Sequence, residues 1–581
     1  DRVVSYMPNV PETMVAFFAV CSIGAIWSSC SPDMGARSVL DRFRQIDPKV
    51  VFAADGYRYG GKDFSRLDVI ATLREELPTL EHVVLLRYLD PAAQVAGAVD
   101  WDDVAHARAD MSFEQVPFDH PLWVVYSSGT TGLPKPIVHG HGGALVKGTQ
   151  DTALQFDLGP QDRFMWFTTT GWIMWNLQMF GLLVGATICL YDGSPGHPDL
   201  DVLWRFADEA ELTFFGAGAA YYLSCRKAGL APGRWMRSRV LKSVGSTGSP
   251  LSEEGYRWIM AQFPDVMVGS TSGGTDVAAG YVGCCPTLPV YAGEMQCRNL
   301  GVAVYAYSDA GEPVDDEVGE LVVTEPMPSM PLYFWNDEDG SRLHDSYFST
   351  FPGVWRHGDW IRITPRGGAV IYGRSDTTIN RHGVRMGTAE IYGVVDDFPE
   401  IQDSLVVDLE YLGRDSYMPL FVVLRAGVAL DAALTQRIKQ AMAEQLGPRY
   451  VPSELISVPD VPRTLSGKKM ELPIKKLLLG KPVAEVASPG AMANPESIAW
   501  YQRWFDAELI WDGVHAGTRN VFVRIGRGAL HFYDQPPREL GRNAIHHIGI
   551  QVVGLQDQYD RMRAGGVALP HPIRWMGEPG S

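Results

Sequence analysis

Short apolar runs alternate with amphipathic stretches through the first two thirds of the chain. Strands are predicted at Val50–Ala53, His82–Leu86 and Thr187–Tyr191, where apolar and β-branched residues stand together. Between such runs, Val202–Glu211 carries apolar residues at helical spacing. Strands that alternate with helices indicate an α/β fold in which helices cover the sheets.

The pattern then becomes strand-rich. Runs at Glu317–Thr324 and Ile361–Ile371 have glycine at their turns and few helical signals. They predict a β-rich subdomain that closes a large domain of residues 1–374.

Three further segments follow the large domain. Residues 375–481 combine the helical pattern Asp431–Gln445 with strand-like runs, which predicts a small α+β domain. Residues 482–507 are rich in Pro, Ala and Ser and are typical of a linker or a surface tail. Residues 508–581 change character again and form a predicted fourth segment.

Composition supports several packed domains. The chain has 581 residues, of which 46% are hydrophobic and 20% charged, with a mean hydropathy of -0.06. Its formal charge of -18 and pI near 5.2 argue against a surface for nucleic acid or anionic membrane, since either needs a basic face. Seven cysteines without a CxxC pair fit buried thiols in a reducing cytoplasm.

The chain opens as if inside a domain. It begins with Asp1 and passes directly into the strand-like Arg2–Tyr6, so we expect the N-terminal part of the large domain to be missing. The sequence therefore leaves open whether a targeting signal precedes it. The apolar run Met14–Trp27 is shorter than the roughly 20 residues that span a bilayer. It predicts a buried helix.

A hydroxyl- and glycine-rich loop follows the predicted strand Leu122–Tyr126. Its sequence is Ser127-Ser128-Gly129-Thr130-Thr131-Gly132-Leu133-Pro134-Lys135. Glycines let backbone N–H groups approach phosphate oxygens, hydroxyls add donors and Lys135 adds positive charge, which together predict a polyphosphate cradle. A P-loop is disfavoured because the Gly-to-Lys spacing differs and Pro136 stands where Ser or Thr would hold magnesium.

This loop resembles the phosphate-binding motif of the adenylate-forming superfamily of acyl-CoA synthetases, luciferases and nonribosomal adenylation domains. The other motifs of the superfamily follow in the expected order at Thr271–Asp276, Val354–Asp359, Gly373–Asn380 with Gly383–Met386, and Pro462–Lys468. The resemblance runs from residue 1 to about residue 505. It implies an adenylation (AMP-binding) domain, a small mobile C-terminal domain, and ATP and coenzyme A as substrates.

Other segments resemble the subgroup of the superfamily that ligates acetoacetate to coenzyme A. These segments are Pro328–Pro331, Phe334–Asp337, Tyr347–Gly353 and Met492–Ser497. In the implied reaction the acetoacetate carboxylate attacks the α-phosphorus of ATP and expels diphosphate, and the thiol of coenzyme A then attacks the acyl-adenylate to release AMP. Ligation of another short acid, such as propionate or butyrate, and an inactive fragment are the alternatives.

The resemblance implies a role for each motif residue. Lys468 bridges the carboxylate and the α-phosphate, and positive groups so placed stabilise the charge that moves in the transition state. Thr275 and Arg385 contact phosphate, and Asp276 holds Mg²⁺ through the phosphates. The other implied ATP and AMP contacts are Ser127, Ser128, Gly129, Thr130, Thr131, Gly132, Lys135, Gly248, Ser249, Pro250, Ser272, Asp359 and Arg374.

Asp359 and Arg374 are expected at the ribose, where a carboxylate accepts from two hydroxyls. Two other positions, Ser272 and Asp276, depart from the usual pattern of the superfamily. Many relatives carry an aromatic residue in place of Ser272, so stacking on the adenine is in doubt. Asp276 replaces the commoner Glu, which keeps the charge and shortens the reach to the metal.

The implied acyl pocket is formed by Trp172, Ile173, Met174, Thr247 and Gly273. Relatives restricted to acetate carry a Trp where this chain has Gly273. The missing indole leaves volume for a longer acid, which fits a four-carbon oxo acid and would also admit butyrate. Trp172 as an ordinary core residue is the alternative.

The junction of the two domains has its own implied residues. Asp376 corresponds to the hinge about which the small domain rotates between the half-reactions, and the Gly383 region approaches pantetheine in the second. Relatives often carry a second Asp where this chain has Thr377.

From about Leu509 the sequence resembles instead a vicinal-oxygen-chelate module of the glyoxalase group, entered part-way through a βαβββ unit. His531 and His547 fall on metal-ligand positions of that group, where neutral imidazoles bind Zn, Fe or Ni. Further ligands of the complete site are missing from the sequence, so a working metal centre is not expected. A glyoxalase-type metalloenzyme is the remaining alternative function.

Overall fold

The structure is a computed structural model and describes residues 1–127, 133–375, 379–381, 384–386, 388–409, 417–446, 450–465, 467–479, 481–504, 507–515, 518–525, 528–533 and 549–552. The chain divides into two compact units. The first comprises residues 1–473 and 487–497, and the second comprises residues 474–486 and 498–581. Each unit is described by itself.

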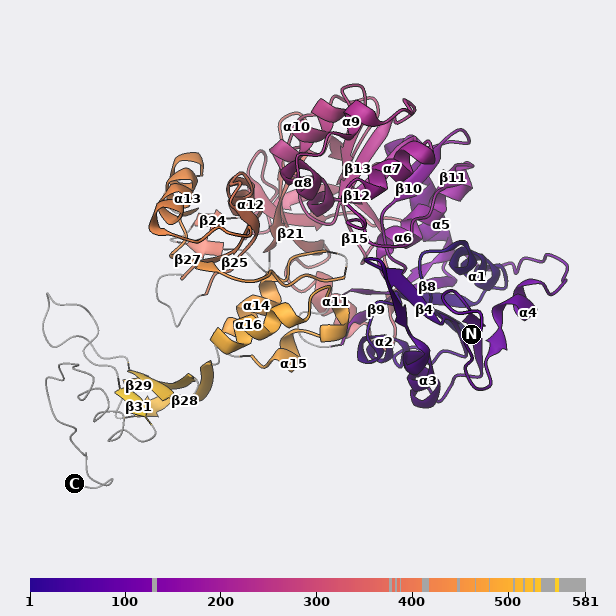
Figure 1. Ribbon diagram of the computed structural model, residues 1–581, viewed down its shortest axis with the longest axis horizontal. Coiled ribbons are helices and arrows are strands. Elements are labelled where there is room, and N and C mark those ends of the chain that lie inside the picture. Colours follow the sequence, from indigo (N-terminus) through magenta and orange to yellow (C-terminus); the bar gives the residue numbers. More distant parts are fainter. Residues whose placement is uncertain are drawn as a thin grey trace, which may run out of the picture. The chain divides into compact units, whose positions relative to one another are not determined.

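An eight-stranded sheet forms the N-terminal part of the first unit (Figure 1). Its order is β20 (Tyr333–Phe334), β9 (Lys135–Gly140), β8 (Pro121–Ser127), β2 (Ile26–Cys30), β1 (Arg2–Tyr6), β3 (Val50–Ala54), β6 (His82–Leu86), β7 (Val99–Asp100). Side chains of α2 (Ala36–Phe43) and α3 (Leu67–Glu76) share one core with this sheet, and side chains of α1 (Pro11–Ser22) and α4 (Trp101–Ala105) share another. The strands predicted at residues 50–53 and 82–86 are confirmed.

The apolar run Met14–Trp27 differs from its prediction. The helix α1 ends at Ser22, and the run continues through a turn into strand β2. Val15 and Phe18 are exposed on the helix, while Phe17 and Val20 are buried. The prediction of a single buried helix is wrong, because apolar residues in succession do not reveal where a turn falls.

The second sheet is parallel, and residues at the carboxyl ends of its strands line the candidate site. Its order is β11 (Thr187–Ile188), β10 (Arg163–Trp166), β12 (Phe214–Gly218), β13 (Ser243–Thr247), β14 (Met267–Ser270). One face packs on α7 (Val202–Glu209), α8 (Ala219–Lys227) and α10 (Glu253–Gln262). Residues of η1 (Asp151–Gln155) and α6 (Ile173–Met179) lie near the carboxyl ends of these strands, where ligands of α/β sheets commonly bind.

Strand-rich segments follow, as predicted. β15 (Ser272–Gly274), β16 (Ala279–Gly283) and β17 (Cys297–Arg298) form one antiparallel sheet. The second consists of β18 (Val304–Tyr307), β19 (Val318–Val323), β21 (Trp355–Ile363) and β22 (Ala369–Arg374). Their core contains α11 (Ser341–Tyr347) through Tyr347, which packs on Trp355.

The C-terminal part of the first unit is a small α+β arrangement. It contains β23 (Ile379–Arg381), β24 (Val384–Met386), α12 (Thr388–Asp396), β25 (Ile401–Val406), β26 (Pro419–Leu424), α13 (Ala432–Gln445) and β27 (Glu454–Ser457). α13 begins where predicted, because the Asp431 side chain accepts from the backbone N–H of Leu434 at 2.8 Å and caps the helix. Leu434, Ile438 and Met442 bury its apolar face against the sheet.

The second unit contains α15 (Val483–Val486), α16 (Glu496–Trp504) from Ile498 onward, and most of α14 (Glu471–Leu478). Its last part is an antiparallel sheet of β28 (Ala507–His515), β29 (Thr518–Ile525), β30 (Gly528–Tyr533) and β31 (Gly549–Val552). In the described part of the chain, no helix is both long and apolar enough to cross a membrane.

Candidate active site

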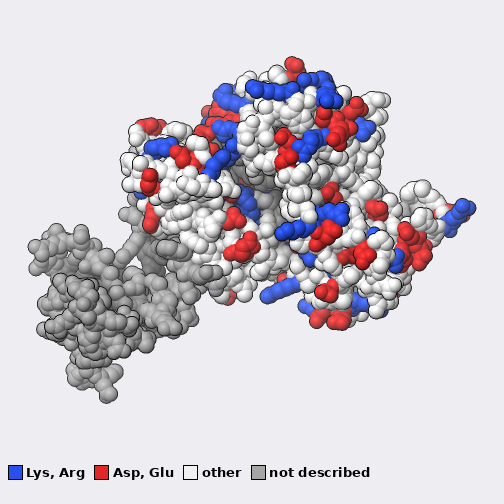
Figure 2. Space-filling view, in the orientation of Figure 1, with Lys and Arg blue, Asp and Glu red and all other residues white. Residues whose placement is uncertain are grey.

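A cleft of about 830 Å³ lies in the first unit, within the size range of small-molecule sites. It brings together residues that the sequence scatters over three hundred positions. The predicted site residues that line it are Trp172, Ile173, Met174, Thr247, Gly248, Ser249, Pro250, Ser272, Gly273, Thr275, Asp359, Arg374 and Lys468. Over the described part of the face drawn in Figure 2, basic and acidic side chains are interspersed.

The predicted phosphate loop connects two antiparallel strands. Ser127 ends β8 and Lys135 begins β9, and the two residues are paired across the ladder. Ser128, Gly129, Thr130, Thr131 and Gly132 lie outside the described residues. The Lys135 ammonium lies 5.1 Å from the ring centroid of Tyr347, so a cation and a phenol meet at the base of the loop.

The Asp276 carboxylate is tied to the same phenol, since the Tyr347 hydroxyl donates to its Oδ1. Burial opposes ionisation of this group. The nearby His357, the Tyr347 hydroxyl, Lys135 and Arg374 nevertheless hold the pKa of Asp276 below its ordinary value. Burial also lowers the pKa of His357. Asp276 therefore stays ionised.

His139 fixes the backbone of Asp276. The Trp123 indole donates to His139 Nδ1 at 3.0 Å, so the ring proton sits on Nε2, which donates to the Asp276 carbonyl at 2.9 Å. Burial lowers the pKa of His139 to about 4, which keeps the ring neutral. This chain of contacts fixes the backbone of the turn that carries Asp276.

The predicted ribose residues face each other across two strands. Asp359 on β21 pairs with Arg374 on β22, and Arg374 Nη1 lies 3.5 Å from Asp359 Oδ1. Asp359 is buried, whereas the Arg374 side chain is 49% exposed. Gly358 has φ +92°, and a Cβ there would lie 2.9 Å from Arg374 Nη2. Any side chain at position 358 would therefore displace the Arg374 guanidinium.

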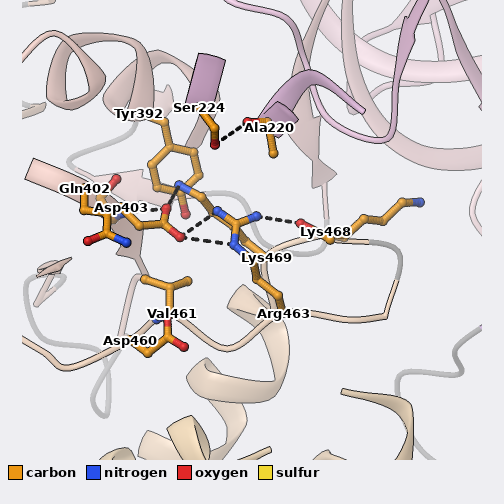
Figure 3. A network of polar contacts seen from close by, with 12 residues as sticks. Ala220, Ser224, Tyr392, Gln402, Asp403, Asp460, Val461, Arg463, Lys468 and Lys469 are labelled. Atoms are coloured by element: carbon orange, nitrogen blue, oxygen red, sulfur yellow. Dashed lines mark hydrogen bonds and ion pairs between the residues drawn. The ribbon is translucent and has the colours of Figure 1, made fainter. Parts of the chain in front are cut away.

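Lys468 stands at the tip of a hairpin that a polar network holds. Arg463 donates to Asp403 Oδ2 through Nε at 3.1 Å and Nη2 at 2.7 Å, and its Nη1 donates to the carbonyl of Gly467 at 2.5 Å. Lys469 lies 3.4 Å from Asp403 Oδ1 and points away from Lys468, whose side chain extends free of the network (Figure 3). The hairpin thus directs two successive lysines to opposite sides.

The environment of Lys468 favours a less basic amine than usual. The Lys468 side chain opens into the cleft, whose walls partly desolvate its ammonium. This desolvation, together with the charge of Arg374, lowers the pKa of Lys468. Asp359 and Asp276 act in the opposite direction. A lysine that faces both a guanidinium and two carboxylates is placed where phosphate and carboxylate charges can be bridged.

The predicted acyl residues lie together in the cleft. Ile173 and Met174 begin α6, and Thr247 donates to the carbonyl of Thr271 at 2.8 Å. A Cβ at Gly273 would lie 2.2 Å from the carbonyl oxygen of Ala279. The close approach of β15 and β16 therefore requires glycine at this position. This requirement is independent of the space that a glycine leaves for the acyl chain.

Several predicted residues have no described position for their side chains. Asp376, Gly383 and His547 lie outside the described residues. Arg385 belongs to β24 and His531 to β30, but their side chains also lie outside the description. Among the described residues, no cluster of three or more His, Cys, Asp or Glu side chains is arranged to hold a metal ion.

Sequence reasoning missed the residues that support the motifs. The sequence places Tyr347 only within a segment that resembles the acetoacetate-ligating subgroup, and it predicts no role for His139, Arg463 or Asp403. Tyr347 lies 71 residues from Asp276, and His139 lies 137 residues from it. No local pattern signals such contacts, although a histidine at the end of the apolar run Pro136–Val138 is a visible cue in the sequence.

Known proteins resemble the chain in sequence and structure. The family AMP-binding enzyme matches residues 1–334, and the AMP-binding enzyme C-terminal domain matches residues 393–468. The chain is 42% identical to acetoacetyl-CoA synthetase of Gallus gallus and 45% identical to acetoacetyl-coenzyme A synthetase of Rhizobium meliloti (strain 1021), in each case over 86% of the chain and 77% of the relative. The solved acetoacetyl-CoA synthetase from Streptomyces lividans matches with 52% identity and a TM-score of 0.82, over 86% and 77% of the two chains.

Proposed function

The chain belongs to the acetoacetyl-CoA synthetases of the AMP-binding enzyme family, and we propose that it ligates acetoacetate to coenzyme A, with ATP cleaved to AMP and diphosphate. One observation carries the proposal: Lys468, the Asp359–Arg374 pair and the acyl residues around Gly273 line a single cleft. That arrangement suits a reaction in which a small acid meets the α-phosphate of a nucleotide.

In the first half-reaction the acid carboxylate attacks the α-phosphorus and diphosphate leaves. Lys468 bridges the two negative groups, while Asp359 takes the ribose hydroxyls and Arg374 lies beside it. Fixed positive charge at the transferring group lowers the barrier because it needs no reorganisation when the charge moves. Arg385 and Thr275 are proposed to contact phosphate, and the loop 127–135 to enclose the diphosphate.

Mg²⁺ fits the carboxylate of Asp276, which directly follows the cleft residue Thr275. This ion is commonly held by one or two carboxylates together with substrate phosphates and water, and Asp276 is an ionised carboxylate near Lys135. Asp276 would hold the ion against the phosphates, and the ion would neutralise part of their charge when bound.

In the second half-reaction the thiol of coenzyme A attacks the acyl-adenylate and AMP leaves. We propose the boundaries 1–374, 375–481, 482–507 and 508–581 for the domains, Asp376 as the hinge and Gly383 as a contact to pantetheine. The glyoxalase-like nature of residues 508–581 and a cytoplasmic location stay predictions. His531 and His547 stay predicted metal-ligand positions of an incomplete site, in which a working metal centre is not expected.

Product analysis tests this function. The purified chain is incubated with ATP, Mg²⁺, coenzyme A and one acid, and thioester and AMP are separated by chromatography and identified by mass. We expect acetoacetyl-CoA and AMP in equal amounts with acetoacetate, and far less product with propionate or butyrate. No thioester from any acid would contradict the proposal, and equal turnover of butyrate would contradict its acid.

A further inference from the structure

Three buried polar side chains form a network at the inner wall of the cleft. Lys147 at the end of α5 (His141–Gln150) makes an ion pair with Asp151 in the π-helical turn η1. Asn299 Nδ2 donates to Asp151 Oδ1 at 3.2 Å, and the backbone N–H of Gly280 donates to Asp151 Oδ2 at 3.3 Å. Lys147, Asp151 and Asn299 are 1%, 7% and 4% exposed. We call these three residues the buried triad.

Two glycines of β16 make room for the amide of Asn299. A Cβ at Gly280 would lie 2.5 Å from Asn299 Nδ2, and a Cβ at Gly283 would lie 2.8 Å from its Oδ1. Gly280 is also the ladder partner of Gly273, the predicted acyl residue. The amide therefore packs on β16, and the neighbouring strand β15 carries Gly273, where the acyl chain is expected.

The triad borders the cleft itself. Asp151 and Asn299 both line it, next to apolar groups such as Phe156 and Met174. Asp151 also settles the orientation of the amide, because only the amide nitrogen donates to a carboxylate. That nitrogen carries two hydrogens, and among the described residues one acceptor, Asp151, is recorded for them. π-helical turns such as η1 occur often at functional sites.

We propose that Asn299 is a specificity-determining residue that donates a hydrogen bond to the 3-oxo oxygen of the acid, with Lys147 and Asp151 as positioning residues. This inference rests on the proposed function. Acetoacetate differs from butyrate by a carbonyl in place of a methylene at carbon 3, so a buried donor separates the two acids where volume cannot. Lys147 balances the charge of Asp151, which otherwise would repel an anionic substrate.

The test compares two acids on matched variants. ATP–pyrophosphate exchange gives kcat/KM for acetoacetate and butyrate with the full chain. Asn299→Leu keeps the side-chain size and removes the donor, and we expect kcat/KM for acetoacetate to fall about 10- to 100-fold while that for butyrate changes less than about threefold. In the control, Gln296→Leu, a buried amide that bonds to Cys285 and Leu288 outside the cleft is lost, and the ratio of the two acids stays as in the unchanged chain.

Equal losses for both acids in Asn299→Leu would overturn the inference. If thermal unfolding shows that this variant does not fold, the unchanged chain decides: a preference for acetoacetate over butyrate above about tenfold supports recognition of the oxo group, and a smaller preference overturns it. A chain that activates butyrate and acetoacetate equally would leave the ligase chemistry intact. A chain that activates no acid would instead contradict the proposed function.

Discussion

Arg463 and Gly467 are joined across the tip of the hairpin that carries Lys468, with the guanidinium Nη1 donating to the Gly467 carbonyl at 2.5 Å. The same guanidinium is anchored to Asp403. The orientation of Lys468 thus depends on an ion pair between residues 60 positions apart.

We expect Arg463→Met to slow acyl-adenylate formation about tenfold or more, because a loosened hairpin places the ammonium less accurately and the Asp403 carboxylate loses one of its two cationic partners. Pyrophosphate exchange with saturating acid measures the effect. Arg437→Met is the control, since Arg437 pairs with Glu400 in an exposed ion pair outside the cleft. Equal rates for the two variants would refute a positioning role for Arg463.

Lys468→Ala should separate the two half-reactions. Loss of the bridging ammonium is expected to lower adenylate formation by about 100-fold or more, since one preorganised donor to developing charge is typically worth that much. The conversion of supplied acetoacetyl-adenylate and coenzyme A to thioester should persist. Single-turnover measurements of each step provide the comparison, and an equal decline in both would sink the assigned role.

Tyr347→Phe should shift the pH dependence. The hydroxyl is one of the groups that keep the pKa of Asp276 low, so its removal raises that pKa. A carboxylate with a depressed pKa contributes stability and charge that are lost as pH falls through the folded pKa. The acid limb of kcat/KM for ATP should therefore move to higher pH.

Tyr333→Phe serves as the comparison for this shift. Tyr333 is partly exposed on the neighbouring strand β20, and no hydrogen bond of its hydroxyl is recorded among the described residues. Its profile should match that of the unchanged chain. Identical acid limbs for all three proteins would show that Tyr347 does not tune Asp276.

Much of the fold follows from local patterns. The strands near residues 50 and 82 and the capped helix α13 need only periodicity and a capping Asp, and the structure has them. The motif residues of the cleft also followed from sequence, through resemblance. The supports did not, because Tyr347, His139 and Asp403 act on residues 60 to 137 positions away. Likewise, the clash that a Cβ at Gly273 would make with Ala279 is a property of paired strands.

Gly358→Ala should raise KM for ATP. The residue has φ +92°, so alanine is strained there by about 1–2 kcal/mol, and its Cβ would also press on Arg374. Gly353→Ala is the matched control, since Gly353 has φ +76° and open space around its Cβ. Both variants should lose similar thermal stability, and only Gly358→Ala should weaken ATP. A similar KM for both would contradict the placement of Arg374 at the ribose.

Acid-dependent exchange of labelled pyrophosphate into ATP, measured without coenzyme A, tests the central claim most directly. We propose that the chain forms an acyl-adenylate in the cleft, and we therefore predict rapid exchange with acetoacetate, weak exchange with butyrate and none without acid. Exchange that does not depend on the acid, or no exchange with acetoacetate, would contradict the account.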